Sequence, residues 1–192
     1  WSSDVCSSDL TADFINVDLQ GWTPEEGEID LLGKEIEQKL YQRQNIGRDL
    51  AIKLRRKVVA NRITKMLHDI GRMTKTIVFC SDIEEAAEMR TLLINMNSDL
   101  CKKSPYYVTR IVGEDKEGKK QLDNFISVDE PYPVIVTTSE LLSTGVDCKT
   151  CGLIVIDKEI GSMTEFKQII GRGTRLRKDK GKWHLEILRS EE

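Results

Sequence analysis

The chain has 192 residues, of which 39% are hydrophobic and 32% are charged, and its formal net charge is −3. A chain of this length can bury one core of useful size, and no apolar run in it approaches the roughly 20 residues that a membrane span needs. The small negative charge argues against a protein that binds nucleic acid through its overall charge, so any such binding must come from a local basic patch.

The five cysteines do not form a pattern typical of a disulfide framework or a metal site. Cys80 lies in an apolar run, where a free thiol behaves as a small hydrophobic group. Cys148 and Cys151 form a single C-x-x-C pair without a second pair or a nearby histidine, whereas a structural zinc site needs about four ligands. We therefore expect reduced thiols in a cytosolic protein and no bound metal.

The two ends of the chain differ in character from the rest. The first ten residues, WSSDVCSSDL, have neither a helical nor a strand period and do not match a signal peptide; they resemble translated sequencing adapter. The last four residues, RSEE, are interpreted in the same way. We therefore expect residues 1–12 and 189–192 to be non-native segments, and both ends to be cut edges.

Residues 13–48 contain glycines, one proline and several acids and are the hardest part of the chain to interpret. Two short strands could lie on either side of Gly33, at residues 29–31 and 34–36. The alternative is a connector that runs over the surface.

Residues 49–70 are predicted to form a helix that ends at Gly71. Its apolar positions recur at roughly helical spacing, at Ala51, Leu54, Val58, Ile63, Leu67 and Ile70. Basic side chains lie largely off that stripe, at Arg55, Arg56, Lys57, Arg62 and Lys65. Such a face can contact DNA phosphates, but a face in water is the more common arrangement and is the one we predict.

From residue 76 onward, strand patterns alternate with helix patterns. Strands are predicted at residues 76–80, 107–112, 134–137, 153–156 and 183–188, and helices at 86–96, around 122–126, and from 163 to about 171. Two S-x-x-E capping boxes, at residues 81–84 and 162–165, precede the first and last of these helices. The alternation predicts an α/β fold with a parallel sheet and helices on both faces. In such sheets the functional loops follow the carboxyl ends of the strands.

The strongest chemical signal is the segment QIIGRGTR at residues 168–175. If the last helix continues through it, Gln168, Arg172 and Arg175 lie on one face. Arginine offers a permanent charge and a planar fork of donors for phosphate oxygens. The alternative is a basic helix end that is stabilised by the helix dipole. Gly171 and Gly173 argue against that alternative, because they weaken a helix that is merely structural.

A second signal is VTTSELLSTGVD at residues 136–147, which begins at the end of a predicted strand. Hydroxyl and backbone N–H groups at a strand end can bind a phosphodiester backbone without reading its sequence. Taken alone, the segment is equally typical of an ordinary strand–turn–helix connection.

Taken together and in order, these segments resemble the second motor lobe of superfamily-two helicases. TIVFC resembles motif IV, TTSELLSTGVD resembles motif V and QIIGRGTR resembles motif VI. The longer runs GEIDLLGKEIE, KTIVFCSDIEEAAEMR, YPVIVTTSELLSTGVDCKTCGLIVID and MTEFKQIIGRGTRLR are similar to type I restriction enzyme R subunits over about residues 27–188. The resemblance divides the chain into a connector and lead-in helix at 13–71 and a RecA-like helicase C-terminal lobe at 72–188.

The resemblance also implies roles for particular residues. Arg172 and Arg175 would be arginine fingers that reach ATP across a cleft between two lobes, and Gln168 and Gly171 would lie near the nucleotide. Gly145 and Asp147 would couple the nucleotide cleft to DNA. Phosphates of a DNA strand would be contacted by Thr137 or Thr138 and by Ser81.

The resemblance further implies an ATP-dependent DNA translocase within a prokaryotic, cytoplasmic restriction endonuclease. Its partners would be double-stranded DNA, the first RecA-like lobe, and the modification and specificity subunits. ATP and Mg²⁺ would be held mainly by the first lobe, so this chain alone is expected to be inactive. A separate specificity subunit would read the DNA sequence.

One segment in this chain approaches a phosphate-binding loop of its own. Residues 113–120, GEDKEGKK, have both glycines and the lysine of the G-x-x-x-x-G-K-[ST] pattern. Lys120, however, stands where a Ser or Thr should hold magnesium, and Glu114, Asp115 and Glu117 would repel phosphates. We interpret the segment as a charged loop in water.

Two alternatives stay open. The chain could be a non-catalytic nucleic-acid-binding RecA-like domain whose motifs are relics, although the intact arginines and the Gly-Val-Asp run count against this. It could also belong to another superfamily-two helicase, such as an RNA helicase of the DEAD/DEAH type. Those enzymes usually carry a second glycine where this chain has Thr174, which favours the restriction-type translocases.

Overall fold

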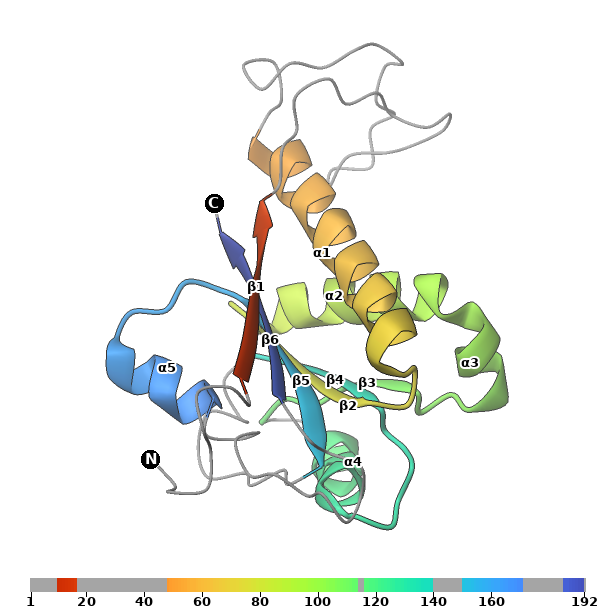
Figure 1. The fold of residues 1–192 in the computed structure, drawn as a ribbon. Coiled ribbons are helices and arrows are strands. Elements are labelled where there is room, and N and C mark those ends of the chain that lie inside the picture. The colour runs from red at the N-terminus through yellow and green to blue at the C-terminus, as the bar shows by residue number, and fades with distance from the viewer. Residues whose placement is uncertain (1–9, 17–47, 114–115, 140–149, 171–184, 192) are drawn as a thin grey trace, which may run out of the picture.

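The computed structural model describes residues 10–16, 48–113, 116–139, 150–170 and 185–191. Within them six parallel strands form one sheet in the order β1-β6-β5-β2-β4-β3 (Figure 1). The strands are β1 Leu10–Asn16, β2 Lys75–Cys80, β3 Val108–Arg110, β4 Ile135–Thr138, β5 Cys151–Asp157 and β6 Leu185–Glu191. The helices are α1 Arg48–Ile70, α2 Ile83–Met96, α3 Ser98–Lys103, α4 Lys116–Ile126 and α5 Met163–Ile170.

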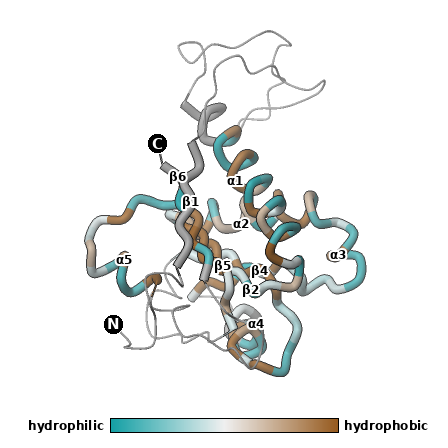
Figure 2. The backbone as a smooth tube through the Cα atoms, viewed as in Figure 1, coloured by the Kyte–Doolittle hydropathy of each residue, from teal (hydrophilic) through white to brown (hydrophobic). Residues whose placement is uncertain are grey.

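The sheet has a separate hydrophobic core on each face, as the near-continuous apolar strands predict. Along β2, Val78 and Cys80 face the core that α1 and α2 cover, whereas Ile77 and Phe79 face the core that contains Phe125 of α4 and side chains of α5. All four of these β2 side chains are fully buried. In Figure 2 the strands at the centre of the sheet are coloured largely as hydrophobic. The predicted parallel α/β fold with helices on both faces is confirmed.

Two elements were not predicted from the sequence. β1 adds a parallel edge strand beside β6, with Leu10 opposite Leu185 and Asn16 opposite Glu191. Its first three residues belong to the segment that was expected to be non-native. The short helix α3 follows α2 directly and ends before Ser104. The strand expected at 107–112 covers only Val108–Arg110, and the possible strands near Gly33 lie outside the described residues.

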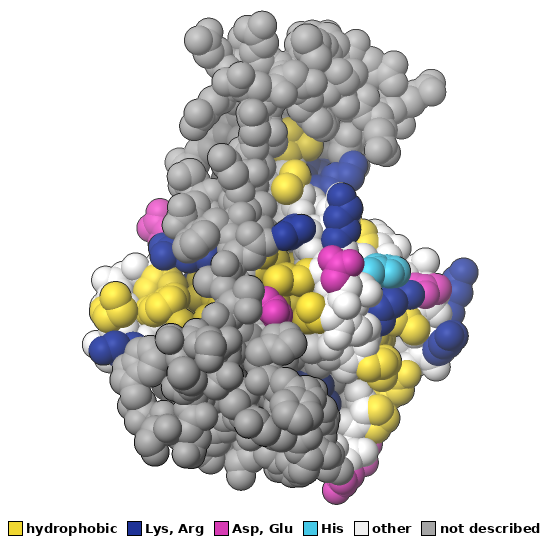
Figure 3. All heavy atoms as spheres, in the orientation of Figure 1, with side chains coloured by type: hydrophobic (Ala, Val, Ile, Leu, Met, Phe, Trp, Pro, Cys, Tyr) yellow, Lys and Arg dark blue, Asp and Glu magenta, His cyan; other side chains and the backbone are white. Residues whose placement is uncertain are grey.

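Helix α1 has the predicted length, and most of its predicted apolar stripe is buried: Leu54, Ile63 and Leu67 are at most 3% exposed. The prediction is wrong at Val58, which is 39% exposed, whereas its neighbours Val59 and Ala60 are fully buried. Basic side chains gather over α1 in the space-filling view (Figure 3), yet Arg56 is only 9% exposed, so the prediction of a face in water is wrong for this residue.

The start of α2 is capped one residue later than the sequence suggested. Asp82, not Ser81, is the N-cap, and its Oδ1 accepts from the Glu85 backbone N–H at 2.8 Å. Glu85 Oε2 in turn accepts from the Ser81 backbone N–H at 3.1 Å. An aspartate caps a helix as well as a serine does, so the same local sequence supports either register.

None of the described helices is long and apolar enough to cross a membrane.

A buried lysine joins the first residue of β2 to the end of α4. Lys75 is 7% exposed, and its Nζ donates to the backbone oxygens of Asn124, Phe125 and Ser127 at 3.3, 2.8 and 3.0 Å. The last carbonyls of a helix have no partner within the helix, and a cation near them is also favoured by the helix dipole. Lys75 therefore caps α4 from a neighbouring strand.

Lys75→Met should lower the free energy of unfolding by about 2 kcal/mol, because it removes a charged donor and leaves buried carbonyls without their partner. Urea denaturation followed by circular dichroism measures this. Lys120→Met, at an exposed position of α4, is the matched control and should change stability little. Equal stability of the two variants would contradict the capping role.

Candidate functional site

Two of the segments that the sequence marked as functional meet, in their described parts, at the carboxyl edge of the sheet: the end of β2 and the end of β4. β2 lies between β4 and β5, and the register places Phe79 opposite Thr138 and Cys80 opposite Asp157. Ser81 therefore follows β2 at the same edge at which the threonines end β4 and at which β5 ends. This is the edge where α/β proteins of this kind bind their ligands.

Thr137 and Thr138 lie at this edge but on opposite faces of the sheet. Thr137 stands opposite Val78 on the side of α2, and its Oγ1 donates to the Ala86 backbone oxygen at 2.8 Å. Thr138 stands opposite Phe79 on the other side. Its hydroxyl is buried and has no hydrogen-bond partner among the residues that the structure describes. Thr137 is thus committed to holding α2, whereas Thr138 keeps an unmet hydrogen-bonding group.

Ser81 is exposed, immediately beyond β2. Its backbone N–H is bound by Glu85, as described above, so the peptide is fixed by the first turn of α2. The position is open to a ligand at the carboxyl edge, as the predicted DNA contact requires.

Ion pairs tie α1 to the same edge. Arg55 contacts Asp157 at 3.0 Å, and Asp157 is 3% exposed at the end of β5. The neighbouring Arg56 pairs with Glu85 at 2.5 Å and also with Glu88, both on α2. Ion pairs that are partly buried are screened less by salt than surface pairs. The lead-in helix is therefore attached by charge both to β5 and to α2.

Cys80 does not have the properties of a nucleophile, although it ends β2 at this edge. Burial raises the pKa of its thiol, and the negative charges of Asp157 and Glu85 raise it further. A thiol needs a lowered pKa to react as thiolate at neutral pH. Its side chain belongs to the core on the α1 and α2 face, which makes Cys80 a structural residue, as the sequence indicated.

The segment from β5 to α5 is fixed by local contacts. Ser162 Oγ accepts from the Glu165 backbone N–H at 3.1 Å, and Glu165 Oε2 accepts from the Gly161 backbone N–H at 3.1 Å. The predicted capping box is thus confirmed. Lys158 bonds to Glu165 at 2.8 Å, and this hydrogen bond is the main reason why the pKa of Glu165 is lowered. The ion pair joins the carboxyl end of β5 to the first turn of α5.

Helix α5 buries one side and exposes the other. Ile169 and Ile170 are 1% and 9% exposed and belong to the second core, whereas Gln168 is exposed. The helix is thus held by its apolar side, with Gln168 directed away from the core. The other predicted residues of the nucleotide site and its coupling loop are Gly145, Asp147, Gly171, Arg172 and Arg175, and they lie outside the described residues.

Residues 113–120, which partly match a phosphate-binding loop, were predicted to form a charged loop in water, and this is wrong for their second half. Gly113 is exposed in a turn, but α4 already begins at Lys116, and Gly118 is buried within that helix. The second half of the segment is therefore helical and not a loop in water. Helix propagation through Gly118 is possible because the following residues carry the amphipathic pattern of α4, with Phe125 fully buried.

The side chains that the structure describes include no group of three or more His, Cys, Asp or Glu that could hold a metal ion. Cys151 is buried in β5 and its Sγ lies 3.3 Å from the Leu153 backbone oxygen; Cys148 is outside the described residues.

Sequence reasoning missed Arg55, Arg56 and Asp157. The two arginines were assigned to a face in water because their partners come from α2 and β5, which a helical pattern does not reveal. Asp157 did carry a signal, since it is the first charged residue after an apolar run and therefore stands at a predicted strand end.

The chain is similar in sequence to a helicase domain family and to subunits of restriction enzymes. Residues 59–177 match the family model described as the helicase conserved C-terminal domain. The chain is 52% identical over 174 residues to the type I restriction enzyme EcoAI endonuclease subunit of Escherichia coli, and the match covers 91% of this chain and 22% of that protein. It is 28% identical to the EcoKI endonuclease subunit of Escherichia coli strain K12, covering 77% of this chain and 13% of that protein.

Solved structures agree. A fragment of a putative HsdR subunit of a type I restriction enzyme from Vibrio vulnificus is 48% identical, with a TM-score of 0.70 over 73% of this chain and 28% of that one. Domain 2 of the DEAD-box helicase Mss116p has a TM-score of 0.55 at 14% identity, covering 71% of this chain and 50% of that one, which shows the fold alone. The chain spans about a fifth of the length of the curated relative that it matches at 52% identity. It belongs to the helicase conserved C-terminal domain family and is homologous to the endonuclease subunits of type I restriction enzymes.

Proposed function

We propose that this chain is the second motor lobe of an ATP-dependent translocase of double-stranded DNA, within a type I restriction endonuclease. The observation that carries the proposal is the 52% identity to a restriction enzyme subunit, and the meeting of the ends of β2 and β4 at one edge of a parallel sheet supports it. The rest of the motor lies in the larger part of such a subunit, which this chain does not cover. The modification and specificity subunits would be its partners in the prokaryotic cytoplasm.

In the proposed reaction, Arg172 and Arg175 reach across a cleft to ATP that is held by the first lobe. Their permanent charge and planar donor forks would stabilise the charge that develops on the transferred phosphoryl group. Gln168, exposed on the last turn of α5, would orient near the nucleotide together with Gly171. We assign Mg²⁺ to the first lobe as well, as the resemblance to these motors implies.

The carboxyl edge would contact the DNA backbone, with Gly145 and Asp147 coupling it to the nucleotide cleft. Hydroxyl groups at a strand end bind phosphates without reading the sequence, as a translocase requires. Both threonines are fully buried, so a phosphate would reach either only once the residues over it move. We favour Thr138, because Thr137 already donates to Ala86 whereas the Thr138 hydroxyl has no partner among the described residues. Exposed Ser81 would be a second contact.

Arg172→Ala or Arg175→Ala, in a subunit that also contains the first lobe, should reduce ATP turnover about a thousandfold or more at saturating DNA for at least one of the two. DNA affinity should change little, and Lys should restore little activity because an ammonium lacks the planar fork. Steady-state kinetics against both ATP and DNA, with a thermal melt, test this. A raised DNA requirement with an unchanged maximal rate would instead assign the arginines to DNA, and a lowered melting temperature with both activities reduced would assign them to structure.

The two threonines form a matched pair for a second test. Thr137→Val should lower the free energy of unfolding by about 1 kcal/mol, because the hydrogen bond to α2 is lost. Thr138→Val should leave stability unchanged or raise it, because it removes a buried hydroxyl without a partner. For DNA affinity the expectation is reversed. Thr138→Val should weaken DNA binding, whereas Thr137→Val should weaken it only as far as its lower stability reduces the amount of folded protein. Urea denaturation and a DNA titration measure both, and equal DNA affinity of Thr138→Val and the parent chain would remove Thr138 from the DNA contact.

A further inference from the structure

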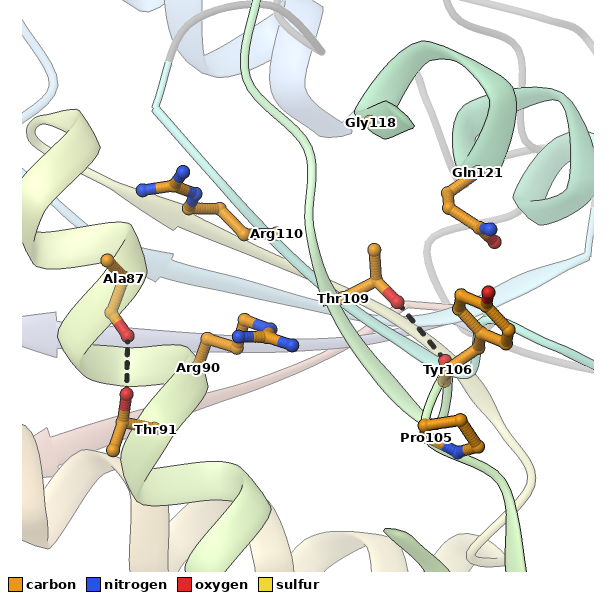
Figure 4. A pocket seen from close by; sticks show the side chains of 9 residues that line it. All are labelled: Ala87, Arg90, Thr91, Pro105, Tyr106, Thr109, Arg110, Gly118 and Gln121. Carbon is orange, nitrogen blue, oxygen red and sulfur yellow. Dashed lines mark hydrogen bonds between the residues drawn. The ribbon is translucent and has the colours of Figure 1, made fainter. Parts of the chain in front are cut away.

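A pocket of about 490 Å³ lies along the free edge of β3, between α2 and α4. β3 is the last strand of the sheet and pairs only with β4 among the described strands. Arg90 comes from α2, Tyr106 and Arg110 come from β3 and the segment before it, and Gln121 comes from α4 (Figure 4). We call this pocket the edge groove. It is separate from the carboxyl-edge residues that were predicted from the sequence motifs.

The edge groove is positively charged. Arg90 and Arg110 are its two charged lining residues, and within the described part of the chain neither forms an ion pair. Arg90 Nε donates to the Val108 backbone oxygen at 3.4 Å, which leaves most of its five donors for a ligand. The nearby acids at positions 114, 115 and 117 are outside the described side chains. In a chain whose formal net charge is −3, two arginines that pair with none of the described carboxylates suit an anionic ligand.

An aromatic ring accompanies the two guanidinium groups. Tyr106 is 46% exposed, and Figure 4 shows its ring at the end of the groove opposite to Arg110, with Arg90 pointing into the space between them. The two threonines of the lining are committed to the backbone: Thr91 donates to Ala87 at 3.0 Å and Thr109 donates to Tyr106 at 3.2 Å. The free recognition groups are thus guanidinium and aromatic ring, the combination with which proteins bind single-stranded nucleic acid.

The groove continues from the proposed DNA-binding edge. Arg110 is the last residue of β3 and stands opposite Thr137 in the register with β4. Figure 4 shows its guanidinium extending toward the arrowheads of the strands, that is, toward the carboxyl edge. A strand of nucleic acid that leaves this edge would therefore meet Arg110 first, then Arg90, then Tyr106.

We infer that the edge groove binds a nucleoside phosphate unit of a single-stranded nucleic acid segment, with Arg110 and Arg90 on its phosphates and Tyr106 against a base. The inference rests on the proposed function, because it places an unpaired strand along β3, beside the carboxyl edge that is proposed to contact duplex DNA. It adds residues that none of the sequence motifs contains. A free nucleotide would offer the same chemistry, so the test includes it.

The test measures binding of a fluorescein-labelled single-stranded oligodeoxynucleotide to the chain by fluorescence anisotropy over a series of salt concentrations. Arg90→Gln and Arg110→Gln together should weaken binding and lower the slope of log affinity against log salt by about 0.7 for each lost phosphate contact. Tyr106→Leu should weaken binding about tenfold, because a stacked base is lost, without changing that slope. Lys102→Gln with Lys103→Gln, which removes the same charge from exposed positions of α3, is the control and should keep the parent slope.

Circular dichroism shows whether each variant folds. If the double variant does not fold, Arg110→Gln alone replaces it, because the Arg110 side chain forms no hydrogen bond to the described residues. Binding by the parent chain that is unchanged in Arg110→Gln and Tyr106→Leu would overturn the edge groove while leaving DNA contacts elsewhere intact. No binding of the single-stranded probe by the parent chain would overturn the groove and leave the proposed contacts to duplex DNA intact, which a duplex of the same sequence, titrated in parallel, tests separately. Loss of AMP binding in Arg110→Gln, with oligonucleotide binding unchanged, would make the groove a site for a free nucleotide and overturn its assignment to a strand.

Discussion

Because helices cover both faces of the parallel sheet, its strands must be apolar along nearly their whole length. Val78 and Cys80 fill one core and Ile77 and Phe79 fill the other, and a polar side chain at any of these positions would be buried without a partner. Polar chemistry is therefore confined to strand ends and to the free edge. That constraint brings Ser81, Thr138 and Asp157 to one border of the sheet although they lie far apart in the sequence.

Charge then connects this border to the rest of the lobe. Arg55 and Arg56 of α1 reach Asp157 and the first turns of α2, and Lys158 reaches Glu165 of α5. Each pair spans two elements that meet at the carboxyl edge. Removing one partner of a buried ion pair lowers the free energy of unfolding by more than the intact pair adds to it, because the remaining charge stays buried without a partner. These contacts therefore fix how α1 and α5 sit relative to the strand ends.

The sequence predicted the parts of this structure that depend on local periodicity. Apolar runs located β2, β4, β5 and β6, and capping residues located the starts of α2 and α5 to within a residue. What it could not predict depends on distant partners. β1 becomes a strand only by pairing with β6, at the other end of the chain, and Arg56 is buried only because Glu85 and Glu88 face it from α2. The capping box at α2 shifted because serine and aspartate are adjacent and either can accept the hydrogen bond.

The candidate site was predictable to the same extent. The strand pattern predicted that Ser81, Thr137 and Thr138 lie at one edge of the sheet, as the register shows, but adjacent residues of a strand face opposite ways. The difference between Thr137, bonded to α2, and Thr138, without a partner, appears only when the helices are in place. The edge groove has no sequence pattern, because its arginines come from a helix and from a neighbouring strand.

The central claim is that this chain is half of a motor, which supplies groups to ATP that another lobe holds. Phosphate release from the purified chain, with ATP, Mg²⁺ and increasing duplex DNA, tests it most directly. The account predicts release no faster than in buffer from the chain alone, and DNA-stimulated release from a polypeptide that joins it to the first lobe. DNA-stimulated release from the chain alone, abolished when Arg172 and Arg175 are both changed to Ala, would contradict it.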